Sequence, residues 1–379
     1  MNWRLLAIPA SIVPFLIMFI FTPVSPNDVF AVGLVPFIIS AASVIVKIML
    51  QAYRFKYFIH KFIGPHVSST GKIMSARLAG EFVTQTTPSF VGGELVRIAW
   101  LTKIGVAPGK ATWVTTIEII ADVFVGTVLG LIAGAVAIYN GGIFIGVIVI
   151  IVVIPTLTFW LLLVIYSAKR NLRLPSFSLK ILQKFVAREK AERLINGTNN
   201  AITDVCKMSR ENFNSRKAVK TFTVGIAITL VAFLFQGISF MVLADSVGSN
   251  VGLFESLMTT SASTALSTIP ITIGGSGLAE LGIWAYISNI NGIPEFADVI
   301  KDSQLNVIIA WRIASYHIPL VIMWIALMKI TIGSKVSVTN PKNISTFPFS
   351  PGVRPNLADD SNPSKNNKTN DGVSEDNKR

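Results

Sequence analysis

The order of hydrophobic and polar positions along the chain predicts a membrane protein made of α-helices. Apolar runs recur through most of the sequence, and short polar or basic segments separate them. A helix that crosses a bilayer needs about 20 consecutive, mainly apolar residues, so we expect an all-α polytopic membrane protein with about six full transmembrane helices. These are residues 5–22, 29–50, 111–138, 143–167, 221–244 and 305–330.

Two further apolar stretches, residues 73–101 and 251–290, are interrupted in the middle by Pro and by two adjacent Gly. Both have the spacing Pro-x3-Gly-Gly, at Pro88, Gly92 and Gly93 and at Pro270, Gly274 and Gly275. Pro removes a backbone donor and Gly allows a sharp turn, so we expect each stretch to form two half-helices. Basic residues flank only the first stretch, which suggests entry from opposite sides and an inverted repeat. The second stretch is also long enough for two short full spans.

The half-helix that follows each Gly pair could bind an anion. The half-helix after the pair offers free N–H groups and the positive end of its dipole, and both favour negative charge. Glu94 and Arg97 follow the first pair, and Gly277 and Glu280 follow the second. Together with Arg312 in the last span, Arg97 could hold the phosphate of a lipid headgroup.

Two carboxylates lie inside the third span. Glu118 and Asp122 are four residues apart, so they share one face of the helix. Charges in a bilayer are costly and tend to be paired or functional. In the structural interpretation, Arg97 or Arg312 forms a salt bridge with one of these carboxylates. In the functional interpretation, the arginines bind a lipid phosphate and a carboxylate relays a proton or an ion.

Composition supports the membrane assignment. Hydrophobic residues make up 51% of the chain and charged residues only 14%, whereas soluble proteins carry about 25% charged residues. The net charge of +13 lies in the segments between the spans, so we expect a bilayer with anionic lipid headgroups, and no nucleic acid, as the partner. One Cys and three scattered His argue against a metal site, and we expect no cofactor. The positive-inside rule places the N-terminus and the C-terminal tail on the cytoplasmic side of the cell membrane.

The chain divides into two membrane halves, a basic linker and a polar tail. The first half covers residues 1–167, the linker 168–220, the second half 221–332 and the tail 333–379. The tail is rich in Asn, Ser, Pro and charged residues and is predicted to be disordered. The apolar positions of the linker favour either an amphipathic helix on anionic headgroups or a solvated helix. The linker could also dock a partner enzyme or a second copy of the chain.

Three motifs together resemble a known family: residues 88–97, the pair Glu118 and Asp122, and residues 270–280. Over roughly residues 5–332 the chain looks like the membrane domain of lysylphosphatidylglycerol synthases and its stand-alone, flippase-like relatives. In the synthases this domain is associated with moving aminoacylated phosphatidylglycerol between leaflets, while a separate soluble domain attaches the amino acid. No soluble domain follows here, so the resemblance implies the translocating half alone. Some relatives are fused to glycosyltransferases that act on polyprenyl phosphates, so the lipid could be of that kind.

The resemblance and the motifs favour a translocator of a phosphate-bearing lipid. The residues expected to bind it are Pro88, Gly92, Gly93, Glu94, Arg97, Glu118, Asp122, Pro270, Gly274, Gly275, Gly277, Glu280 and Arg312. An intramembrane enzyme is an alternative, with carboxylates as acid, base or metal groups, although we identify no catalytic residue. A subunit that delivers lipid to a partner enzyme of a cell-envelope or glycosylation pathway is another. The absence of a Gly-x4-Gly-Lys-Ser/Thr motif argues against direct use of ATP.

Overall fold

A computed structural model of the protein describes residues 31–87, 92–169, 174–183, 187–213, 215–249, 251–269, 274–288 and 306–332. Helices make up nearly all of these residues, and no strand occurs among them. The predicted all-α fold is therefore confirmed. The expected first span at residues 5–22, the tail at residues 333–379, Pro88 and Pro270 lie outside the described residues.

Five helices of the described part are long and apolar enough to cross a membrane. They are α3 (Leu34–Phe62), α6 (Pro108–Tyr139), α7 (Ile143–Lys169), α10 (Arg216–Asp245) and a last helix, Asn306–Thr331. The second part of this last helix is α14 (Ile318–Ile332). Each corresponds to one of the predicted spans, so the polytopic membrane architecture is confirmed. A π-type turn, Ile313–His317, interrupts the last helix.

The second span is longer than its apolar run indicates. We expected it to end at residue 50, but α3 continues to Phe62. Arg54 and Lys56 are therefore helical residues, and the expected end of the span was wrong. The helix ends where Gly64 precedes Pro65, because a residue before proline is disfavoured in the helical conformation. The buried side chain of Arg54 faces neighbouring helices rather than water.

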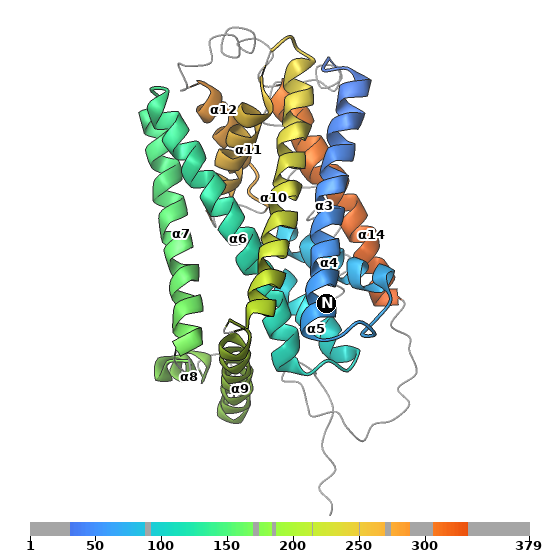
Figure 1. Ribbon diagram of the computed structural model, residues 1–379, viewed down its shortest axis with the longest axis vertical. Helices are drawn as coiled ribbons and strands as arrows, with labels where there is room; N and C mark the ends of the chain where they lie inside the picture. The colour runs from blue at the N-terminus through green and yellow to red at the C-terminus, as the bar shows by residue number, and fades with distance from the viewer. Residues whose placement is uncertain are drawn as a thin grey trace, which may run out of the picture. The chain divides into compact units, whose positions relative to one another are not determined.

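Helices α3 and α10 run side by side in opposite directions (Figure 1). Three contacts fix their register, namely Lys47 with Gln236, Arg54 with Thr229, and the Phe58 ring against Gly225. In each pair the residue number rises along α3 by as much as it falls along α10, as antiparallel helices require. The lack of a side chain at Gly225 leaves room for the Phe58 ring.

Each interrupted stretch folds as two short helices. The first forms α4 (Thr70–Thr86) and α5 (Gly93–Lys103), and the second forms α11 (Leu253–Ser267) and α12 (Leu278–Ser288). In Figure 1, α4 and α5 lie in the lower half of the bundle, and α11 and α12 lie in the upper half. The halves pack reciprocally, because α4 lies against α14 and α11 lies against α6.

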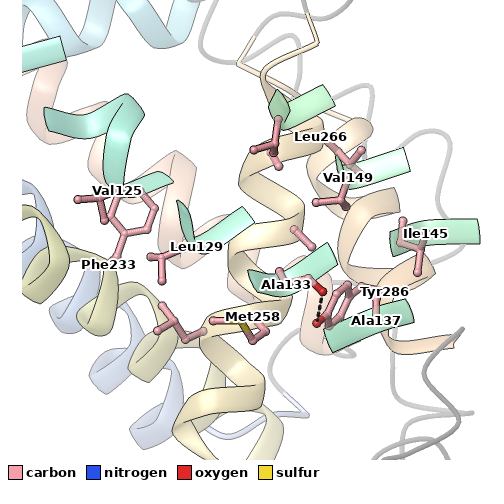
Figure 2. Close-up of a cluster of buried hydrophobic side chains, with 14 residues drawn as sticks. Val125, Leu129, Ala133, Ala137, Ile145, Val149, Phe233, Met258, Leu266 and Tyr286 are labelled. Carbon is pink, nitrogen blue, oxygen red and sulfur yellow. Dashed lines mark hydrogen bonds between the residues drawn. The ribbon is translucent and has the colours of Figure 1, made fainter. Parts of the chain in front are cut away.

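An apolar core holds the second short pair against the long helices (Figure 2). Leu129 of α6, Val149 of α7, Phe233 of α10 and Leu266 of α11 belong to it. The hydroxyl of Tyr286 on α12 donates a hydrogen bond of 3.1 Å to the carbonyl of Ala133 on α6, so the one polar group that α12 brings into this core has an acceptor.

The linker contains two helices, α8 (Ser176–Gln183) and α9 (Arg188–Phe213). Helix α9 packs against α6, α7 and α10, and it buries Ala191 and Cys206. One face of α9 therefore packs against the long helices and makes it part of the helical body.

Candidate functional site

Glu118 lies at the centre of a buried charge network in the first half. Its carboxylate is fully buried and contacts three arginines. Arg97 Nη1 lies 2.8 Å from one oxygen, and Arg54 Nη2 lies 3.2 Å from the other, which also accepts a hydrogen bond from Arg77 Nε. The arginines come from α3, α4 and α5 and the carboxylate from α6, so this contact ties four helices together.

Asp122, one turn further along α6, faces the same network. Arg54 donates to both of its oxygens at 2.7 Å, in a bidentate arrangement. Gln51 donates a longer hydrogen bond of 3.4 Å to the same carboxylate. Glu118 and Asp122 therefore share a helix face, as their spacing predicted. Unlike Glu118, the side chain of Asp122 is 28% exposed.

The N-terminus of α5 is occupied by its own carboxylate. Glu94 Oε2 accepts a hydrogen bond of 3.0 Å from the backbone N–H of Gly92, and Oε1 lies 3.4 Å from Arg97. Local geometry explains why both positions of this pair are glycine. Gly92 has a φ of +124°, and a Cβ on Gly93 would overlap the carbonyl of Gly80. We expected a free anion site at this helix end, whereas the structure has a glutamate there.

The second broken segment repeats this arrangement. Glu280 Oε2 accepts a hydrogen bond of 2.7 Å from the N–H of Gly277, and Oε1 lies 2.7 Å from Arg312 Nε. Arg312 also donates a hydrogen bond of 2.7 Å to the carbonyl of Gly274. Thus each short helix after a Gly pair carries a glutamate that joins its own N-terminus to an arginine.

Tyr316 brings the two broken segments together. Its hydroxyl donates a hydrogen bond of 3.0 Å to the carbonyl of Gln85, near the end of α4. Its ring packs against Gly274, where a Cβ would overlap it, and the Arg312 guanidinium lies 4.3 Å from the ring centroid. Tyr316 belongs to the π-type turn, a distortion that often marks functional positions.

The structure thus gathers the expected site residues into two groups. Glu94, Arg97, Glu118 and Asp122 form the first group with Gly92 and Gly93, and Gly274, Gly277, Glu280 and Arg312 form the second, with Gly275 beside Ser267. Of the salt bridges considered from the sequence, Arg97 does pair with Glu118. The alternative for Arg312 was wrong, because Arg312 pairs with Glu280 rather than with Glu118 or Asp122.

Three further residues join the first group and were not among the site residues expected from the sequence. Arg54 lies beyond residue 50, where the second span was expected to end, and Arg77 and Glu81 lie in the first interrupted stretch. Arg77 pairs with both Glu81 and Glu118. The available signal was their spacing, since Arg77 and Glu81 lie four residues apart and continue one polar face of α4.

The described residues form helices long enough to cross a membrane, and these helices enclose paired charges where two broken segments meet. These features define a polytopic, all-α membrane protein. The chain belongs to the family described as the lysylphosphatidylglycerol synthase transmembrane region, whose model matches residues 7–322. No curated protein matches the chain. Within the described ranges, no group of three or more His, Cys, Asp or Glu side chains is arranged to hold a metal ion.

Proposed function

We propose that the protein moves a phosphate-bearing lipid, either a phospholipid or a polyprenyl-phosphate-linked lipid, between the leaflets of the cell membrane. The observation that carries this proposal is the polar junction around Tyr316, Arg312 and Gln85 inside apolar helices. A charged headgroup crosses the hydrocarbon layer only where protein groups replace its water. The family to which the chain belongs is named after the synthase of lysylphosphatidylglycerol, a phosphate-bearing lipid. This membership supports a lipid as the substrate.

We further propose that the two halves form an inverted repeat and that both broken segments are re-entrant. In this alignment, α3 corresponds to α10, α4 to α11, α5 to α12, and α6 to the last helix. The reciprocal packing of α4 on α14 and of α11 on α6 supports the alignment, as does the antiparallel pairing of α3 with α10. Translocation would then alternate between two related conformations, with the Gly pairs as hinges.

In the proposed cycle, the lipid phosphate takes the place of the glutamates at the two helix N-termini. Glu94 and Glu280 each hold an arginine and a backbone N–H, the two kinds of donor that phosphate uses. Both carboxylates are partly exposed, at 28% and 18%. Arg97 and Arg312, by contrast, are almost fully buried, so a phosphate would reach them only by displacing a glutamate.

We assign the end of the bundle that carries α8 and α9 to the cytoplasm, because basic residues concentrate there. The N-terminus and the tail would lie on the same side. Phe177 and Ile181, one turn apart on α8, are exposed and flank Lys180, a pattern that fits a helix in the headgroup layer. The same surface could dock a partner enzyme or a second copy of the chain.

The test is reconstitution of the purified protein in liposomes with a leaflet-specific probe on a phosphate-headgroup lipid. Wild type is expected to move the probe, and Arg97→Ala is expected to slow it by about tenfold or more, since one charge-assisted contact is lost. Arg188→Ala is the matched control, because Arg188 forms an exposed ion pair on α9 and should leave the rate unchanged.

Two results would contradict the proposal. If wild type moves neither a phospholipid nor a polyprenyl phosphate probe, the translocator function is wrong. If Arg97→Ala moves the probe as fast as wild type, the function stands but the site is wrong. Recovery of a covalently altered lipid would favour an intramembrane enzyme instead.

A further inference from the structure

Lys47 lies inside the bundle, in an otherwise mainly apolar part of α3. It is 13 residues after the start of α3 at Leu34 and 15 before its end at Phe62, so it occupies the middle of the helix. The side chain is half-buried. Its ammonium donates a hydrogen bond to Gln236 Oε1 and lies 5.4 Å from the centre of the Phe233 ring.

Lys47 differs from the buried arginines in its partners. Arg54, Arg77, Arg97 and Arg312 each have a carboxylate within 4.0 Å. Within the described ranges, no carboxylate lies within that distance of Lys47. Glu81 and Asp122 act on its charge at longer range, but Arg77 and Arg54 already bind them.

An ammonium in this position has an incomplete environment. Cations inside a membrane protein are paired with anions or face a functional cavity. An amide oxygen and an aromatic ring stabilise a lysine without pairing its charge directly. Of the three N–H donors of the ammonium, one has an acceptor, Gln236, among the described residues, so two donors are left for an anionic ligand.

We infer that Lys47 is a direct ligand of the lipid phosphate during translocation. This inference rests on the proposed function and names a further binding residue for it. A lysine suits this role because its ammonium is a compact point charge with three donors, of which Gln236 uses one.

The groups around Lys47 connect it to both broken segments. Gln236 is held by a hydrogen bond of 2.9 Å from its Nε2 to Thr264 Oγ1, in the last turn of α11. Gln51, one turn along α3 from Lys47, donates to Asp122 of the first group. Thr264 and Gln51 are half-buried, like Lys47, so a phosphate at the ammonium would have polar neighbours from both halves.

The first test compares three variants in the liposome translocation assay. Lys47→Met keeps the length of the side chain without its charge, and it is expected to slow translocation about tenfold to a hundredfold, the loss of one charge-assisted hydrogen bond. Lys47→Arg should retain most of the rate. Lys56→Met is the matched control, because Lys56 is a half-buried lysine of the same helix and also lies over an aromatic ring, at 5.8 Å from Tyr53.

The second test measures binding without transport, by native mass spectrometry of the protein in detergent. The probes are phosphatidylglycerol, a polyprenyl phosphate, diacylglycerol with matched chains, and inorganic phosphate. Wild type and Lys56→Met are expected to retain a phosphate lipid, whereas Lys47→Met should bind it about tenfold or more weakly. Retention of inorganic phosphate alone would assign the site to free phosphate rather than to a headgroup. Diacylglycerol binding should not depend on Lys47.

The outcomes separate this inference from the proposed function. Lys47→Met that transports and binds like Lys56→Met overturns the inference and leaves the function standing. Lys47-dependent binding without any transport supports Lys47 as a phosphate ligand but contradicts the proposed function, and with it the role of Lys47 during translocation. Thermal unfolding in detergent is measured for the same variants. If Lys47 is a ligand residue, the Lys47→Met variant should be at least as stable as wild type. A Lys47→Met protein that loses both stability and binding, and is not rescued by Lys47→Arg, would make Lys47 structural and overturn the inference.

Discussion

The two broken segments use the same local arrangement, but they are anchored very differently. In both, a glutamate joins the helix N-terminus to an arginine. Around the first segment, however, three arginines converge on Glu118 and tie α3, α4, α5 and α6 together. Among the described residues, the second segment has a single ion pair, between Glu280 and Arg312, together with the contacts of Tyr316.

This difference indicates which part of the molecule can move. A network in which one carboxylate, Glu118, binds three arginines opens only if several contacts break together, whereas a single pair opens in one step. We therefore expect the first segment to act as the rigid side of the site and α12 as the mobile side. The following predictions test this contrast, from the largest expected effect to the smallest.

Removing the charge at the centre of the first network should have the largest effect. Glu118→Gln leaves three buried arginines without their shared carboxylate, and we expect a loss of about 3–5 kcal/mol in the free energy of unfolding. Thermal or denaturant unfolding in detergent measures this. Glu255→Gln, in the first turn of α11 and without an ion pair among the described residues, is the control and should change little. Equal stability of the two variants would refute the rigid-network interpretation.

The next largest effect is expected from alanine substitutions at Gly93 and Gly277, which should lower the free energy of unfolding by different amounts. A Cβ on Gly93 would overlap a backbone carbonyl, and we expect Gly93→Ala to destabilise the protein by about 3 kcal/mol. Gly277 has a φ of +86° but open space around it, so Gly277→Ala should cost only about 1 kcal/mol of backbone strain. Unfolding curves of both variants decide the order, and a larger loss for Gly277→Ala would show that the second segment is the tighter one.

Removing the arginine that pairs with each segment's glutamate compares the anchoring of the two segments directly. Arg312→Gln deletes the single ion pair of α12, with an expected loss of about 1.5–3 kcal/mol and faster amide hydrogen exchange confined to that helix. Arg97→Gln removes both ion pairs of α5, but this helix still packs against α4 and α6, so we expect a smaller change in its exchange. Exchange followed by mass spectrometry measures both. Faster exchange in α5 than in α12 would reverse the assignment of the mobile side.

The smallest effect is expected from the contact between the segments. Tyr316→Phe retains the ring under Arg312 and removes only the hydrogen bond to Gln85, at about 1 kcal/mol. If this bond couples the segments, a double-mutant cycle of Tyr316→Phe with Arg312→Gln will show non-additive unfolding free energies. Additive values would mean that the two segments touch without being coupled. Tyr57→Phe supplies the control for loss of a tyrosine hydroxyl elsewhere.

Much of the fold could be predicted because hydropathy acts within single helices. The five described spans appear as apolar runs, and the interruptions at Gly92 and Gly274 appear as local Gly pairs. The error at α3 has a physical reason. A helix can continue beyond the apolar run when its polar side chains find partners, as Arg54 does with Asp122. Hydropathy does not report such partners.

The candidate site was predictable only in part, for a related reason. The shared face of Glu118 and Asp122 follows from helix periodicity, and so does the proximity of Glu94 to Arg97. The choice of Glu280 as the partner of Arg312 does not, because it depends on how helices distant in the sequence pack. The position of Tyr316 in a π-type turn could not be predicted either, because no pattern in the sequence indicates this turn.

The sequence by itself determined a polytopic helical membrane protein, its two interrupted segments and the residues that carry charge within the apolar regions. These properties depend on side-chain polarity and on the period of a helix, both of which are local. Only the tertiary structure decided which charges neutralise one another and which, like Lys47, have no nearby carboxylate among the described residues. Ion pairing acts over a few ångströms between separate helices, so it is set by their packing.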